Sequence, residues 1–213
     1  ANTMDMSSNT VFSSTLSAPS TSTMITPVTT IMAESSLTKE QVVATLGLPA
    51  GMDPLTFSSF DTTLTDAEKT TALAVEKAAQ KVMSIVSTFA TAAESSGASS
   101  AMAFKVAMTA VVESVKDATT AYEAAVTAST TPVVLAFTDA QVDAVKLEMD
   151  TQITAAIAGT DGYTAGDMTT AMESVFDTQV SNNVIALKNV VGKIAAITNS
   201  DLSASKDIFA LTS

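Results

Sequence analysis

Two loops of the sequence carry pairs of carboxylates that could serve a calcium ion. The segment GTDGYTAGD contains Asp161 and Asp167, and the segment MDPLTFSSFD contains Asp53 and Asp61. Calcium takes about six to eight oxygen ligands, from carboxylates and carbonyls. Neither loop follows the D-x-[DN]-x-[DN]-G pattern, and a turn followed by a helix cap explains each loop better. We therefore expect no cofactor, and calcium is the single candidate if there is one.

Most other residue types that carry enzyme chemistry are missing. The chain has no His and no Cys, which excludes His-based triads, thiol nucleophiles and zinc-thiolate sites. Asp139, Asp143 and Asp150 fit the solvated face of a helix better than a catalytic carboxylate pair. No phosphate-binding loop or dinucleotide fingerprint is present. We expect that the protein is not an enzyme.

The charge balance argues against a nucleic-acid partner, and the lengths of the apolar runs argue against a membrane span. All ten cations are Lys, and against 22 carboxylates they leave a net charge of -12. A nucleic-acid binder needs clustered cations to neutralise phosphates, so we expect no nucleic acid. The longest uncharged apolar run, Val133–Phe137, is far below the ~20 residues of a membrane span. The absence of Arg, His and Trp suits a protein exported in bulk, although mutational bias would produce the same composition.

Capping boxes mark where helices begin. Thr38, Thr65 and Thr138 are each followed three residues later by Gln or Glu, which is typical of a helix N-terminus. An apolar seam runs from Phe104 to Ala125 at helical spacing. The long helices expected are residues 66–95, 99–128, 138–158 and 167–198, the last capped by Asp167.

These elements predict a mainly α protein. Short connections favour antiparallel neighbours, so about four long helices and some short ones should form an up-and-down bundle over residues 25–213. Residues 1–24 are rich in Ser and Thr and predict an extended N-terminal arm or a β-strand. A single strand is not stable alone, so the arm must pack on the domain or pair with a partner, unless it stays disordered. Residues 133–137 predict a strand-like connector or a simple apolar loop.

The junction between arm and bundle has its own local signals. Pro27 suits the first turn of a short helix capped by Thr26, and Gly47 suits the left-handed residue that ends the next helix. The residues expected to join the arm to one end of the bundle are Ile25, Pro27, Ile31, Leu46, Leu48, Phe57 and Phe60. The simpler expectation is that these residues form a folded end cap of the bundle that binds no ligand.

The same segment resembles a known kind of module. Residues 25–31 read ITPVTTI, residues 46–49 read LGLP, and Phe60 precedes Asp61. In this order they resemble a recurrent segment of very large bacterial cell-surface proteins, of the adhesin-like and haemolysin-type secreted kinds. The resemblance implies an extended segment, a short helix and then Ala-rich helices, in a protein outside the cell. Those proteins often carry acidic calcium-binding repeats, which this sequence lacks.

The sequence therefore predicts an extracellular structural protein, secreted with its signal peptide already removed. Its expected partner is itself: the arm, through Val11, Phe12 and Leu16, should dock on a neighbouring subunit by strand addition or groove filling. Such contacts build filaments when they do not close into a ring. The alternative is a secreted helical module that binds calcium or a small apolar ligand in a Met-lined pocket, although such Met residues are more often simply core.

Overall fold

The computed structural model describes residues 4–5, 10–11 and 16–198. Two short strands, β1 (Met4–Asp5) and β2 (Thr10–Val11), pair antiparallel with Met4 opposite Val11. Phe12 of the predicted arm lies outside the described residues. The extended character of the arm as a whole stays a prediction.

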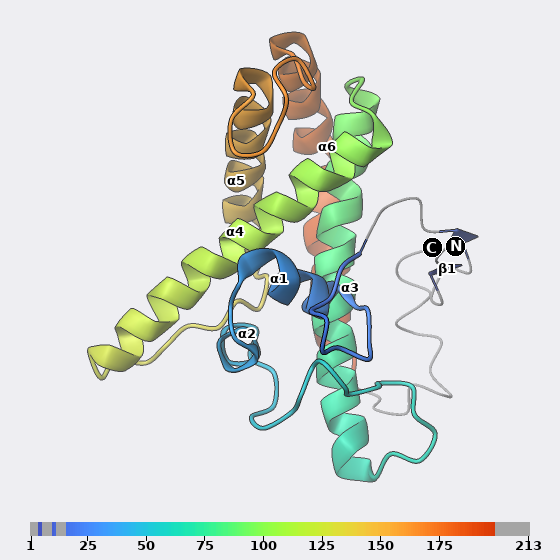
Figure 1. Cartoon of the computed structure of the whole chain (residues 1–213), viewed down its shortest axis with the longest axis vertical. Helices are drawn as coiled ribbons and strands as arrows, with labels where there is room; N and C mark the ends of the chain where they lie inside the picture. The colour runs from blue at the N-terminus through green and yellow to red at the C-terminus, as the bar shows by residue number, and fades with distance from the viewer. Residues whose placement is uncertain (1–3, 6–9, 12–15, 199–213) are drawn as a thin grey trace.

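The described chain is mainly helical, as predicted. Its helices are α1 (Pro27–Ser35), α2 (Lys39–Thr45), α3 (Asp66–Ser95), α4 (Ser100–Thr127), α5 (Asp139–Ala158) and α6 (Thr170–Ala196). The chain reverses direction at each step from α3 to α6 (Figure 1). Helices α3 and α6 lie side by side, whereas α4 crosses α3 obliquely and packs on α5 (Figure 1). Helix α1 contacts both α3 and α4.

The helix starts follow from local capping. The hydroxyl of Thr65 accepts the N–H of Glu68, and the carboxylate of Glu68 accepts the N–H of Thr65 at 2.8 Å. The predicted start of the last helix at Asp167 is wrong, because α6 begins at Thr170 with Thr169 as its N-cap. The carboxylate of Asp167 instead accepts the N–H of Thr164 at 3.0 Å. The Asp167 side chain is therefore engaged within the preceding loop.

Alanines line the centre of the helical core. Ala103, Ala107 and Ala110 are fully buried on α4, and such small side chains let helix axes approach closely. Phe89 and Phe176 fill the space between the helices, with no solvent exposure. None of the helices in the described part of the chain combines the length and apolar character needed to cross a bilayer.

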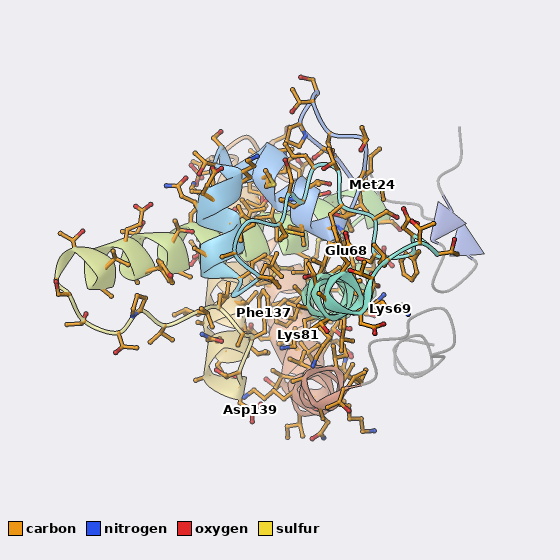
Figure 2. The ribbon with its side chains drawn as sticks, turned by 90° about the horizontal axis from the view of Figure 1, so that it is seen from below. Met24, Glu68, Lys69, Lys81, Phe137 and Asp139 are labelled. Carbon is orange, nitrogen blue, oxygen red and sulfur yellow. The ribbon has the colours of Figure 1, made fainter. Side chains whose placement is uncertain are left out.

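The segment 133–137 is an apolar loop, not a strand. The N–H of Leu135 donates to the carbonyl of Thr45 at 2.7 Å, and the ammonium of Lys81 donates to the carbonyl of Ala136 at 2.9 Å. Phe137 is buried, on the side of α3 where Lys81 also lies (Figure 2). This loop therefore joins α2, α3 and α5.

Candidate assembly interface

Residues 16–24, called the root segment below, are fixed to the domain. The N–H of Ser17 donates to the hydroxyl of Thr30 at 3.2 Å, and that hydroxyl lies 2.9 Å from the carbonyl of Ser17. Leu16, predicted as part of the docking arm, packs partly buried against the chain's own core. The root segment therefore begins on the surface of α1.

A second set of hydrogen bonds holds the far end of the root segment. The N–H of Thr23 donates to the carbonyl of Leu55 at 2.9 Å, and the hydroxyl of Ser22 lies 3.0 Å from that carbonyl and 2.6 Å from the carbonyl of Met24. Leu55 lies in the loop that leads to α3. Both ends of the root segment are therefore bound to the domain, so residue 16 has a defined position on its surface.

Most of the predicted junction residues lie in or on the core. Ile31, Leu46 and Leu48 are buried, and Pro27 is the first residue of α1. Phe57 is half-buried and packs against a buried pair on α3. Two predicted junction residues are on the surface instead: the exposed fractions are 62% for Ile25 and 51% for Phe60.

The first pair of candidate calcium ligands is engaged in local contacts. The carboxylate of Asp53 accepts the Lys39 ammonium at 3.0 Å and the N–H of Leu55 at 3.0 Å. These bonds, led by that from Lys39, lower the pKa of Asp53. The carboxylate of Asp61 accepts the hydroxyl and N–H of Thr63, which lowers the pKa of Asp61. Both carboxylates therefore already accept hydrogen bonds from nearby groups of the same chain.

The second pair lies in the loop between α5 and α6, which a lysine holds. The Lys105 ammonium donates to the carbonyl of Gly162 at 2.7 Å and lies 4.5 Å from the centre of the Tyr163 ring. Asp161 and Asp167 are both exposed. Among the described residues, no three acidic side chains come together as a metal ion would require. The expectation of no cofactor, with calcium as the single candidate, stays a prediction.

Carboxylates expected on a solvated face are partly used in ion pairs. Asp143 on α5 lies 2.6 Å from the ammonium of Lys188 on α6. Asp150 lies 2.9 Å from the ammonium of Lys146, one turn away on α5. Asp139 is exposed in the first turn of α5. This face therefore carries both signs of charge.

The C-terminal end of α4 and the start of the following loop form an exposed surface that was not predicted from the sequence. We call residues 124–134 the α4 tip. The end of α4 stands clear of the other helices in both views (Figures 1 and 2), and at the other end of the tip the carbonyl of Val134 accepts the side-chain amide of Gln141 on α5 at 2.9 Å. Val126 is 55% exposed and Val133 is 74% exposed. A signal was available, because no charged residue occurs between Glu123 and Asp139.

Comparison of the chain with protein families, with curated proteins and with solved structures gave no match.

Proposed function

We propose that this chain is a structural subunit that assembles with copies of itself at the cell surface or outside the cell. The segment 1–15 docks on a neighbouring subunit, and the long helices form the rigid body that carries it. The observation that carries the proposal is the bound root segment. Since Ser17 and Thr23 are held by the domain, the preceding residues are presented from a fixed place.

The composition of segment 1–15 supports a docking role. Its single charged side chain is Asp5, and Val11 and Phe12 give it an apolar centre between Ser and Thr residues. A lone extended peptide gains stability by adding to an existing surface, through main-chain hydrogen bonds and alternate side chains. The segment is thus suited to bind a partner as an extended peptide once β1 and β2 separate.

The extracellular setting rests on two separate supports. One is the resemblance of residues 16–61 to a segment of large bacterial surface proteins, through ITPVTTI and LGLP. The other is a composition without Arg, His or Trp, which limits the nitrogen that an exported protein removes from the cell. A chain with net charge -12 also stays soluble until a specific contact forms.

The test compares the full chain with a chain that lacks residues 1–15. This deletion leaves the Ser17 and Ser22 hydrogen bonds intact, so it separates docking from folding. We expect the full chain to form oligomers in sedimentation velocity and filaments in negative stain. The shortened chain should keep its helical circular dichroism and stay monomeric.

A matched pair of full-length variants removes the need for deletion. Val11→Ser with Phe12→Ser takes away the apolar centre of the segment, whereas Ser7→Ala with Ser8→Ala keeps it. Loss of assembly in the first variant alone supports the proposal. Assembly by the shortened chain, or a full chain that is monomeric at every concentration, would overturn it.

A further inference from the structure

We infer that the acceptor for segment 1–15 is the α4 tip of a second copy of this chain. This inference rests on the proposed function and adds to it the partner surface. The sequence places the donor at one end of the chain, and the structure supplies a projecting surface of matching character. Four observations on the described residues lead to it.

The first observation is where the tertiary contacts of α4 end. The hydroxyls of Thr45 and Thr119 lie 2.8 Å apart, and the Gln41 amide donates to the carboxylate of Glu123 at 2.8 Å. Beyond Glu123 the end of α4 is held by a local hydrogen bond, in which the N–H of Thr130 donates to the carbonyl of Ala125 at 2.9 Å. The end of α4 thus extends past the support given by α2.

The second observation is that the tip exposes apolar side chains. Val126 on the last turn of α4 and Val133 in the loop are 55% and 74% exposed. A fully buried Val side chain contributes about 1.5–3 kcal/mol relative to an exposed one. Covering both valines with Val11 or Phe12 of another copy would therefore favour association.

The third observation concerns backbone donors in the loop. The N–H groups of Val133 and Val134 make no hydrogen bond to any residue that the structure describes. Pro132, just before them, has no N–H to offer. An extended peptide laid along one side of this loop can accept from one of these two donors, because consecutive N–H groups of an extended chain point to opposite sides.

The fourth observation is charge, and it favours the tip over Leu147, an exposed apolar side chain on α5. Two copies of a chain with net charge -12 repel each other, so close contact is cheapest where neither surface is charged. The tip and residues 6–15 carry no charge. Leu147 is 69% exposed on α5, but Lys146 and Glu148 flank it.

The geometry of this contact gives an open assembly. Donor and acceptor are different surfaces of the same chain, so the contact is head-to-tail and extends into a filament unless it closes. An extended peptide spans about 3.3 Å per residue, so residues 6–15 cover roughly 30 Å once the pairing of β1 with β2 is released. That is enough to lie along the loop and the last turns of α4, which rise about 1.5 Å per residue.

The test uses two full-length variants that are each defective in one half of the contact. Val11→Ser with Phe12→Ser damages the donor, and Val126→Asp with Val133→Asp damages the acceptor. The acceptor substitutions lie at exposed positions, so the helical fold should persist. Leu147→Asp is the matched control, since it adds a carboxylate at an equally exposed apolar site on α5.

We expect each defective variant to be monomeric alone in sedimentation velocity, and an equimolar mixture of the two to form a 1:1 pair. The pair arises because one intact donor meets one intact acceptor and no chain can grow. Leu147→Asp should assemble like the unsubstituted chain. A mixture that stays monomeric, or a Leu147→Asp chain that fails to assemble, would overturn the assignment of the tip.

The same experiment separates this inference from the proposed function. If the donor variant is monomeric while the acceptor variant still assembles, the docking segment stands and the α4 tip is not its acceptor. If the donor variant assembles normally, the proposed function itself fails. A mixed pair that persists at high salt supports the uncharged contact, and one that dissociates in salt contradicts it.

Discussion

The hydroxyl oxygens of Thr45 and Thr119 lie 2.8 Å apart in the core and join α2 to α4. Thr119 also donates its single hydroxyl proton to the carbonyl of Val115 at 2.8 Å. Thr45 must therefore be the donor between the two threonines. Both side chains are buried, so the order of donation fixes which substitution leaves a polar group without a partner.

This order predicts unequal effects of two isosteric substitutions. Thr119→Val leaves the buried hydroxyl of Thr45 unpaired and should reduce the free energy of unfolding by about 1–3 kcal/mol. Thr45→Val removes only the donor, and the cost should be less than about 1.5 kcal/mol. The double variant should be more stable than Thr119→Val alone. Urea denaturation of the three variants measures this, and equal effects of the single substitutions would contradict the assigned donor.

Two glycines predict opposite responses to alanine. Gly159 has a φ of 72°, and a Cβ there would lie 2.5 Å from the backbone nitrogen of Ala165. Gly159→Ala should therefore cost more than the roughly 1–2 kcal/mol of left-handed backbone alone. Gly192 lies within α6 with open space around it, so Gly192→Ala should add about 0.5–1 kcal/mol. Thermal unfolding tests the pair, and a gain in stability at Gly159 would contradict the close contact.

Local signals predicted the beginnings of several helices. Thr38, Thr65 and Thr138 each precede the first residue of a helix, because a capping box acts within one turn of chain. The prediction of Asp167 as the cap of the last helix was wrong, because Thr169 caps that helix. The carboxylate of Asp167 accepts the N–H of Thr164 instead, which only the structure shows. The N-cap of a helix could therefore be predicted where the sequence offers a single capping residue near the helix start.

The end of α4 shows what periodicity cannot predict. The apolar seam from Phe104 to Ala125 is regular, yet Met108, Val111 and Val115 are buried while Tyr122 is only half-buried. Spacing defines a helix face, but it does not say which neighbour covers that face or how far the neighbour reaches. The α4 tip and the root segment depend on such long-range contacts and were therefore not predicted.

Lys81 predicts a pH dependence of stability in the alkaline range. Burial first, and the charge of Lys77 second, lower the pKa of Lys81 in the folded chain from 10.5. The unfolded chain then binds more protons, so the free energy of unfolding rises with pH from the lowered pKa towards 10.5. Lys81→Met should reduce this rise in urea denaturation.

The measurement should stop below about pH 10, where unfolded tyrosine begins to ionise. Burial raises the pKa of Tyr163, so ionisation of this residue in the unfolded chain lowers stability above that pH and would mask the lysine effect. Lys193→Met, on the exposed end of α6, controls for loss of a positive charge. A slope that Lys81→Met leaves unchanged would contradict the role assigned to burial.

The loop between α5 and α6 predicts the response to calcium. The Lys105 ammonium already occupies the carbonyl of Gly162 at 2.7 Å, and a divalent cation beside it would meet a positive charge. We therefore expect no change in melting temperature of the full chain in millimolar calcium. Lys105→Met should lower stability by removing this bond and the contact with the Tyr163 ring, a contact of about 0.5–1 kcal/mol at an exposed site. Asp161→Asn should leave the melting temperature in calcium unchanged, and a calcium-dependent rise that Asp161→Asn abolishes would show that the loop binds the ion.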